Sequence, residues 1–406
     1  MKASDKIELP ERMRDPSTLR LFAALKAGGI DARFVGGCVR NAVLGREIDD
    51  IDMAVSAPPE TVMRALNAVK IRNIPTGLKH GTVTAIVEGR PYELTTLRRD
   101  VETDGRHAVV AFTDDWQEDA ARRDFTFNAL YADPDGTLYD PFDGRADLSD
   151  HKVRFIGDAD RRIVEDRLRV MRFFRFHAWY GAPPIDGVGF QACVRHAGAL
   201  GSLSAERVAK ELLRLLAAPV SASGPADAIE AMSEAGALDH WLPEYDGTRR
   251  LRALMEREPK ADGLRRFAAI LPADADAPAI GKRLKLSTQQ ALRLEIMLAH
   301  EPVMDVAGGP KAWRAGIYRL GANLYTDRLL LSIDAQGDWR GALALAESWT
   351  APELPVSGGD ALKLGLKPGP KVGALLDQVE RWWIAGDFAA DRAACLAELE
   401  RLAKNT

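Results

Sequence analysis

The sequence is poor in cysteine, and the three cysteines it has give no framework for disulfides or zinc. Cys38, Cys193 and Cys395 are odd in number and widely separated along the 406 residues, which fits a reducing compartment. No uninterrupted apolar run approaches the roughly 20 residues needed to span a bilayer. Residues 1–15 lack the apolar centre of a signal peptide. We therefore expect a cytoplasmic protein.

A strong net charge is also missing. The formal charge is -4, with 46% hydrophobic and 28% charged residues, values typical of a protein with a substantial core. This balance gives no global sign of a polyanion partner, so any such contact must come from a local patch. The chain exceeds the size at which a single core stops growing, which predicts two or more domains.

The chain changes character near Asp150. Before it, short β-like runs alternate with helical ones, and residues 81–98 are typical of a hairpin with a turn at Glu88-Gly89-Arg90. After it, helical patterns dominate. We therefore expect an α+β protein with a mixed-sheet head followed by all-helical parts. The expected segments are a head over 1–150, a neck over 151–217, a body over 218–350 and a tail over 351–406.

Two common glycine motifs for phosphate are absent: the Gly-Lys-Ser/Thr of a P-loop and the G-x-G-x-x-G of a dinucleotide fold. Instead, FVGGCVRNAVLGREIDDIDMAV (34–55) combines a Gly36-Gly37 turn with Arg40 and, further on, three aspartates. The amides of such a turn, leading into a helix, form an anion site to which an arginine adds a charged donor.

The aspartates Asp49, Asp50 and Asp52 would repel a phosphate unless a cation lay between them. On a strand side chains alternate faces, so Asp50 and Asp52 point the same way and Asp49 points to the other side. Mg²⁺ is commonly bound by one or two carboxylates together with substrate phosphates. We predict that Asp50 and Asp52 bind Mg²⁺; a solvated acidic turn is the alternative. Glu93 is either a third carboxylate near the metal or a surface residue.

Five motifs in this order resemble those of the nucleotidyltransferase superfamily, and more narrowly of the bacterial-type (class II) tRNA nucleotidyltransferase and poly(A) polymerase family. One departure is Asn41, which follows Arg40 where the family usually has Asp. The motifs are GGCVRNAVLGREIDDID (36–52), ARRDFTFNALYADPDG (121–136), DPFDGRADL (140–148), VEDRLRVMR (164–172) and SLSAERVAKELLRLL (202–216).

The resemblance implies a polymerase-beta-like head with a nucleoside triphosphate site. Asp50 and Asp52 would be the catalytic, metal-binding pair. An arginine can fork onto phosphate, while Asp and Asn side chains hydrogen-bond to ribose hydroxyls. The residues implied to hold triphosphate and ribose are Gly36, Gly37, Arg40, Arg123, Asp124 and Asn128.

The Glu-Asp-x-x-Arg motif is implied to select the base. On one helix, Glu165 and Arg169 are four residues apart and Asp166 and Arg169 three apart, so all three would share a face. A fixed Asp acceptor beside a fixed Arg donor pairs with cytosine and adenine and clashes with uracil and guanine, with Glu165 orienting Arg169. An ordinary surface ion pair is the alternative.

Residues 97–112 are polar in the middle and predict a mobile loop. In the family such a loop accompanies addition of the terminal A, although a plain surface loop is the alternative. The residues assigned to it are Arg99, Asp100, Asp104 and Arg106. Cationic side chains elsewhere either contact RNA phosphates or are solvated; they are Arg172, Arg175, Lys367 and Lys371.

The function implied is template-independent addition of C, C and A to the 3′ end of tRNA from CTP and ATP, with the helical parts gripping the acceptor arm. A poly(A) polymerase shares the head but tends to carry a Gly-Arg-Arg/Lys-Phe run where this chain reads IPTGLKHGTVTAI. That favours the tRNA enzyme. An enzyme adding only A stays open, and a non-catalytic RNA-binding protein ranks lower because both aspartates are present.

Overall fold

A computed structural model describes residues 1–103, 108–220, 224–300, 304–333 and 336–404, with the backbone alone for 100–103 and 108–110. Contacts divide the chain into two units, Met1–Pro243 and Glu244–Thr406. Across the described ranges, no helix has both the length and the apolar character needed to cross a membrane. The finer division into head, neck, body and tail remains a prediction.

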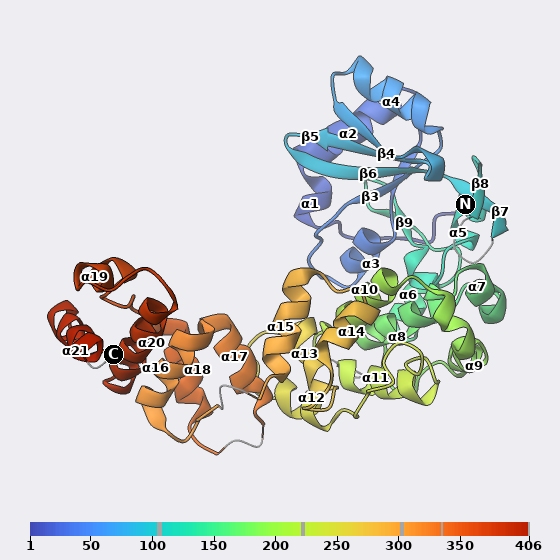
Figure 1. The fold of residues 1–406 in the computed structure, drawn as a ribbon. Helices are drawn as coiled ribbons and strands as arrows, with labels where there is room; N and C mark the ends of the chain where they lie inside the picture. Colours follow the sequence, from blue (N-terminus) through green and yellow to red (C-terminus); the bar gives the residue numbers. More distant parts are fainter. Residues whose placement is uncertain (104–107, 221–223, 301–303, 334–335, 405–406) are drawn as a thin grey trace. The chain divides into compact units, whose positions relative to one another are not determined.

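A mixed sheet forms the centre of the first unit (Figure 1). Its order is β1-β10-β9-β2-β3-β6-β5-β4, and all pairs are antiparallel except β3 with β6. This confirms the expected mixed-sheet head. The strands of this sheet are β1 (Asp5–Lys6), β2 (Ala32–Val35), β3 (Asp52–Val55), β4 (Arg72–Gly77), β5 (Thr82–Val87), β6 (Arg90–Thr96), β9 (Tyr131–Ala132) and β10 (Thr137–Tyr139).

The predicted hairpin is confirmed as β5 and β6. Glu88 and Gly89 form its two-residue turn with φ of 52° and 79°, the left-handed pair that matches the twist of paired strands. Along β5 the buried Val83 and Ala85 alternate with the partly exposed Thr82 and Thr84. One face of the hairpin therefore packs on the core, and the other is polar.

The expected loop over 97–112 is wrong at its ends, because they form a separate antiparallel pair, β7 (Arg98–Thr103) and β8 (Ala108–Phe112). The β-branched residues in these ends suit a strand. Arg99 is exposed. Asp104 and Arg106 lie outside the described residues, and only the backbone of Asp100 is described.

Helices cover the sheet of the first unit. α2 and α4 pack on β4, β5 and β2 (Figure 1), while Val35, Ala54 and Tyr131 join a core on the opposite face. The helices are α1 (Glu11–Arg14), α2 (Pro16–Ala27), α3 (Gly37–Val43), α4 (Pro59–Ala68), α5 (Trp116–Ala121), α6 (Gly144–Ser149), α7 (Ala159–Glu165), α8 (Leu168–Tyr180), α9 (Gly187–His196), α10 (Ala205–Leu216) and α11 (Gly224–Glu234), with 3₁₀ turns η1 (Leu78–His80), η2 (Thr126–Asn128) and η3 (Ala197–Ser202).

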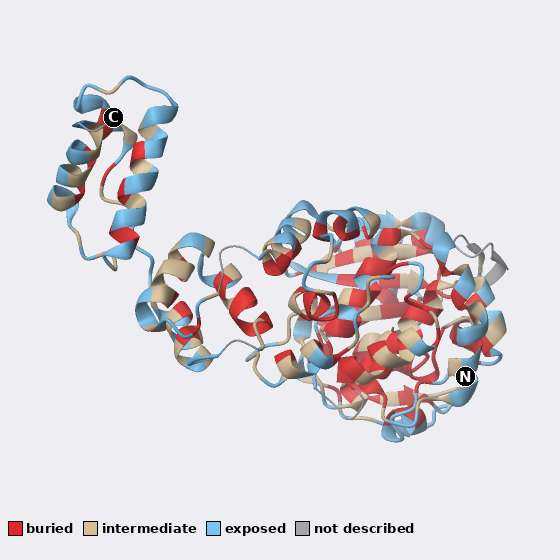
Figure 2. Cartoon of the chain, turned by 60° about the horizontal axis from the view of Figure 1, so that its bottom comes forward, coloured by how far each residue is buried: buried red, intermediate tan, exposed pale blue. Residues whose placement is uncertain are grey.

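In the described part of the second unit, the regular elements are helices joined by turns and loops. Trp313 and Trp383 lie in two separate small cores, and the last helices bury one side and expose the other (Figure 2). Its helices are α12 (Arg249–Met255), α13 (Gly263–Ala269), α14 (Ala277–Arg283), α15 (Thr288–Leu298), α16 (Gly309–Leu320), α17 (Ala322–Leu331), α18 (Trp339–Ser348), α19 (Gly358–Lys363), α20 (Pro370–Ala385) and α21 (Arg392–Lys404).

Candidate active site

The Gly36-Gly37 turn joins β2 to α3 and lies against two arginines. Gly36 has a φ of 70°, a left-handed backbone that favours glycine. A Cβ on Gly36 would lie 3.6 Å from Nη1 of Arg123, and one on Gly37 would lie 3.7 Å from Nη2 of Arg40. Because neither glycine has a side chain, the turn does not cover the guanidinium groups of Arg123 and Arg40.

Arg40 is a buried guanidinium with neutral hydrogen-bond partners. It is 8% exposed, its Nη1 donates to Oδ1 of Asn128 at 2.7 Å, and its Nη2 donates to Oδ1 of Asn41 at 3.2 Å. The Cζ atom of the Arg40 guanidinium lies 4.4 Å from the centroid of the Tyr180 ring. Burial lowers the pKa of Arg40, and its Nε has no hydrogen-bond partner among the described residues.

A hydrogen-bonded chain leads from Arg40 to the helices after the sheet. Asn128 donates from Nδ2 to Oδ1 of Asp124 at 2.9 Å, and Arg172 donates from Nε to the other oxygen of Asp124 at 2.6 Å. Although burial raises the pKa of Asp124, Arg172 and the bond from Asn128 lower it to about 2. Arg172 and Arg175 both contact Glu211.

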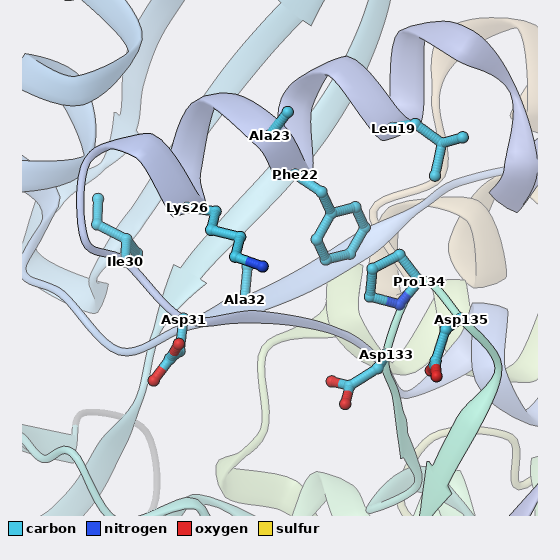
Figure 3. A pocket seen from close by; sticks show the side chains of 10 residues that line it. All are labelled: Leu19, Phe22, Ala23, Lys26, Ile30, Asp31, Ala32, Asp133, Pro134 and Asp135. Carbon is cyan, nitrogen blue, oxygen red and sulfur yellow. The ribbon is translucent and has the colours of Figure 1, made fainter.

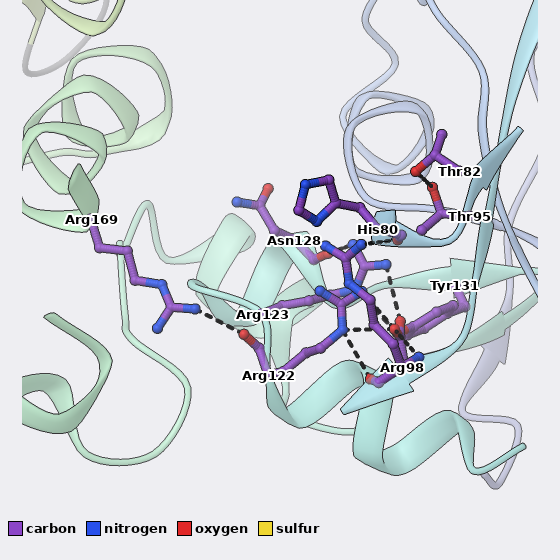
Figure 4. A network of polar contacts seen from close by, with 10 residues as sticks. His80, Thr82, Thr95, Arg98, Arg122, Arg123, Asn128, Tyr131 and Arg169 are labelled. Atoms are coloured by element: carbon purple, nitrogen blue, oxygen red, sulfur yellow. Dashed lines mark hydrogen bonds and ion pairs between the residues drawn. The ribbon is translucent and has the colours of Figure 1, made fainter. Parts of the chain in front are cut away.

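Arg123 is fixed by a second network (Figure 4). Its Nε donates to the hydroxyl of Tyr131 at 3.1 Å, and its Nη2 donates to Oδ2 of Asp119 at 3.1 Å. Asp119 also accepts from Arg122 and Tyr131. Burial raises the pKa of Asp119, but Arg123 and Arg122 bring it well below its usual range.

The acidic part of the site lies at the start of β3. Asp52 is in register with Glu93 of β6. Burial, Glu93 and Asp50 raise the pKa of Asp52 to about 6, against the opposite effect of Arg123. The strand begins at Asp52, so the expectation that Asp50 and Asp52 share a strand is wrong. Asp50 is exposed in the loop before the strand.

A hard cation fits this acidic part. Carboxylate oxygens are the ligands that Mg²⁺ prefers, and the pKa of Asp52 is raised first by burial and then by the neighbouring Glu93. Among the described residues, no three or more His, Cys, Asp or Glu side chains gather closely enough to form a metal cage. Asp50 and Asp52 could offer carboxylate oxygens to a metal that is shared with substrate phosphates.

The Glu-Asp-x-x-Arg motif departs from the expected single helix. α7 ends at Glu165 and α8 begins at Leu168, because the Asp166 carboxylate accepts from the Leu168 amide at 3.1 Å and competes with the helical pattern. The predicted contact of Glu165 with Arg169 is present at 2.7 Å. Asp166 also forms an ion pair with Arg207 at 2.7 Å, a contact that was not predicted.

Arg169 also links the helices to the head. Its Nη2 donates to the carbonyl of Arg122 at 3.0 Å (Figure 4), and Arg162 shares Glu165 with it at 2.8 Å. The four residues predicted to contact RNA have different surroundings. Arg172 and Arg175 form ion pairs with Asp124 and Glu211. Lys367 and Lys371 are exposed near the start of α20 in the second unit.

Sequence reasoning missed several residues that hold the site together. Asp119 precedes Arg122 and Arg123 by three and four residues, a spacing that could have identified it. Tyr131 lies only eight residues after Arg123 but was not identified, and Tyr180 and Glu211 come from distant helices that left no local signal. Arg207, within the motif at 202–216, forms an ion pair with Asp166 in the structure, a contact that the sequence did not identify.

A cavity of about 450 Å³ elsewhere in the head is separate from this site (Figure 3). Its lining combines apolar residues such as Phe22 and Ile30 with the charged Lys26, Asp31 and Asp133. None of the residues predicted for catalysis, triphosphate or base selection lines it. The cavity is therefore not part of the site formed by Arg40, Arg123 and Asp52.

Carboxylates beside arginines on a mixed sheet can position a triphosphate for attack. In agreement with this, a family model described as the poly(A) polymerase head domain matches residues 32–154. The chain is a nucleotidyltransferase. A second model, described as the probable RNA- and SrmB-binding site of polymerase A, matches residues 185–248.

Relatives match nearly the whole chain. The CCA-adding enzyme of Geobacillus stearothermophilus is 34% identical over 409 residues, covering 94% of this chain and 95% of its own. The mitochondrial CCA tRNA nucleotidyltransferase 1 of Danio rerio is 32% identical over 387 residues, covering 91% and 87%. The chain belongs to the class II family of CCA-adding tRNA nucleotidyltransferases and poly(A) polymerases.

The fold agrees with this family. The crystal structure of the Bacillus stearothermophilus CCA-adding enzyme in complex with CTP superposes with a TM-score of 0.75 at 29% sequence identity, covering 97% of this chain and 98% of that one.

Proposed function

We propose that this protein adds C, C and A to the 3′ end of tRNA from CTP and ATP, without a nucleic-acid template. The observation that carries the proposal is the bonded chain Arg40–Asn128–Asp124–Arg172. It connects the Gly-Gly turn of the head to α8, the helix that carries Arg169. One rigid network can thus hold a triphosphate at one end and a base at the other.

Asp50 and Asp52 are the residues we propose to hold Mg²⁺. Bound there, Mg²⁺ would activate the 3′-hydroxyl of tRNA and offset charge on the α-phosphate. The chain itself contributes Asp52, a carboxylate whose pKa is raised by burial and by the neighbouring charge of Glu93. Such a site attracts a divalent cation and repels a triphosphate that arrives without one.

Arg40 and Arg123 are proposed to bind the triphosphate. Arg40 has Asn41 and Asn128 as partners, and none of the carboxylates among the described residues forms an ion pair with it. A buried guanidinium in this state is costly, and an anionic ligand relieves the cost by supplying the missing counter-charge. Asp119 fixes Arg123 in place, which reduces the ordering needed on binding.

Asp166 and Arg169 are proposed to read the base. Glu165 holds Arg169, and Arg207 holds Asp166, so acceptor and donor are each fixed by a separate partner. Cytosine and adenine both present an amino donor beside a ring-nitrogen acceptor, which this pair can match. Uracil and guanine present the reverse order and would leave charged groups unpaired, at a cost of about 1–3 kcal/mol or more.

The test is incubation of the purified protein with tRNA lacking its CCA end, CTP, ATP and Mg²⁺. Incorporation of two C and one A residues is the expected result, and no incorporation would disprove the proposal. Long tails with ATP alone would identify a poly(A) polymerase. Incorporation of A with no C would identify an enzyme that depends on a CC-adding partner.

A further inference from the structure

The loop between α3 and β3 carries Asp50, one of the two residues proposed to hold Mg²⁺. Asp49 and Asp50 are exposed in this loop, whereas Ile48 and Ile51 on either side of them are buried, at 8% and 3% exposed. Apolar contacts are non-directional, so the isoleucines anchor the loop on the core without defining its orientation. The directional contacts lie at the start of the loop.

Helix α3 ends in a glycine turn that leads back to Asn41. Gly45 has a φ of 62°. Its amide donates to the carbonyl of Ala42 at 3.1 Å, and the amide of Arg46 donates to the carbonyl of Asn41 at 2.9 Å. These two bonds form a Schellman motif, in which a glycine with a left-handed backbone ends the helix. The chain therefore turns back on α3, and Glu47 comes to lie beside the Asn41 side chain.

The Asn41 side chain uses both ends of its amide. Its Oδ1 accepts from Nη2 of Arg40 at 3.2 Å, and its Nδ2 donates to the carbonyl of Glu47 at 3.0 Å. One side chain thus contacts both the guanidinium proposed to bind triphosphate and the backbone of the loop, three residues before Asp50. An ionised carboxylate at this position could accept from Arg40 but could not donate to a carbonyl. The pair of bonds therefore depends on the amide.

The ring of Tyr180 joins the same two parts a second time. Cζ of Arg40 lies 4.4 Å from its centroid and Cζ of Arg46 lies 4.9 Å from it, within the range in which a cation is attracted to an aromatic face. Nη1 of Arg46 also donates to the carbonyl of Trp179 at 3.3 Å. Because the end of α8 holds the start of the loop in this way, loss of the Asn41 side chain should loosen the loop without unfolding it.

We propose that Asn41 is a positioning residue that holds the Asp50 loop against Arg40 and so sets the separation of the metal and triphosphate halves of the site. The inference rests on the proposed function, in which Arg40 binds triphosphate and Asp50 binds Mg²⁺. Carboxylates that share a cation with substrate phosphates must lie at a defined distance from the groups that bind those phosphates. Asn41 therefore acts on the gain in nucleotide affinity that Mg²⁺ provides, and much less on binding through the arginines alone.

The test measures the Kd for CTP in the absence of tRNA, so that no turnover occurs, by isothermal titration calorimetry in EDTA and in excess Mg²⁺. The ratio of the two Kd values is the gain that Mg²⁺ provides. Groups that orient metal ligands typically contribute about 10–100-fold to metal affinity, so Asn41→Ala should lower the ratio about tenfold. Its Kd in EDTA should change little, because Arg40 keeps its contacts with Asn128 and Tyr180.

Two further variants separate the bond to Glu47 from the bond to Arg40. Asn67→Ala is the matched control, because Asn67 is exposed elsewhere in the same unit, and it should keep the full ratio. Asn41→Asp can still accept from Arg40 but cannot donate to the Glu47 carbonyl, so its ratio should fall as well. Its Kd in EDTA should rise, because the new carboxylate supplies Arg40 with a counter-charge that competes with triphosphate.

Each outcome bears on a different part of the proposal. A ratio for Asn41→Ala equal to that of Asn67→Ala would overturn the inference about Asn41. A full ratio for Asn41→Asp would overturn it too, because the bond to Glu47 would then have no effect on the loop. If Mg²⁺ does not tighten CTP binding in the unchanged protein, or if that protein adds no nucleotide to tRNA, the proposed function on which the inference rests is refuted.

Discussion

Asp52 and Glu93 lie opposite each other in register across the parallel strands β3 and β6. Their side chains therefore share one face of the sheet, and Glu93 is one cause of the raised pKa of Asp52. In the sequence, helix α4 and strands β4 and β5 lie between the two residues. Their pairing makes Glu93 part of the electrostatic surroundings of the proposed metal site.

Replacing Glu93 by glutamine should weaken the binding of divalent cations. Glu93→Gln removes one negative charge close to Asp52 at nearly constant volume, and Coulomb attraction for Mg²⁺ falls accordingly. The Mg²⁺ concentration for half-maximal CMP incorporation should rise severalfold. Glu60→Gln, an exposed change in the same unit, is the control, and identical Mg²⁺ titrations for the two variants would contradict the prediction.

Replacing Asp52 by asparagine should nearly abolish nucleotide addition. Loss of a catalytic metal ligand removes several kcal/mol of transition-state stabilisation, which is about a 1000-fold or greater fall in kcat. Asp49→Asn is a close control, because Asp49 is exposed and lies only three residues away. Single-turnover CMP incorporation measures both; comparable losses in the two variants would mean that Asp52 has no special role.

Local patterns predicted the parts of the fold that local interactions determine. Alternation along β5 and the Glu88-Gly89 turn identified the hairpin, because burial on one face and a left-handed turn are both written into neighbouring residues. The contact of Glu165 with Arg169 followed from helical spacing for the same reason.

The missed features depend on residues distant in sequence. The break at Asp166 could not be inferred from spacing, since its carboxylate both accepts from the Leu168 amide and pairs with Arg207, 41 residues away. Likewise, Tyr180 beneath Arg40 and Glu211 beside Arg175 come from other helices. Such partners become visible only once packing has brought the elements together.

Stability should fall in mild acid because of His177, which is 4% exposed in α8. Burial lowers its pKa from 6.5 to about 4, against the opposing charge of Asp227. Between these two values the unfolded chain binds a proton that the folded chain does not. The free energy of unfolding should therefore drop as the pH falls from about 6.5 to 4, by up to about 3 kcal/mol from this group.

Urea unfolding at pH 7.5 and pH 4.5 measures this loss. His177→Gln should show a smaller decrease between the two pH values than the unchanged protein, whatever its stability at pH 7.5. His80→Gln, at an exposed position, should keep the full decrease. A decrease of the same size in all three proteins would show that His177 does not govern it.

Replacing Arg207 by alanine should relax the choice of base. The Arg207 guanidinium holds Oδ2 of Asp166 at 2.7 Å, while the Leu168 amide holds the other oxygen. Without Arg207 the carboxylate gains freedom, and a misoriented acceptor loses part of its discrimination against uracil. A loss of about 1.4 kcal/mol would lower the CMP-to-UMP incorporation ratio about tenfold.

The ratio of kcat/KM for CTP and UTP measures the effect, with Arg195→Ala as the control because its ion pair with Asp160 lies at the surface of the same unit. The KM for tRNA should be unaffected in both variants. Arg207→Lys should recover part of the discrimination, since an ammonium group restores the charge but not the planar geometry of the guanidinium. The alternative outcome is that Arg207→Ala lowers activity and leaves the CTP-to-UTP ratio of kcat/KM unchanged. That result would mean that Arg207 supports only the fold and that base selection does not depend on its ion pair with Asp166.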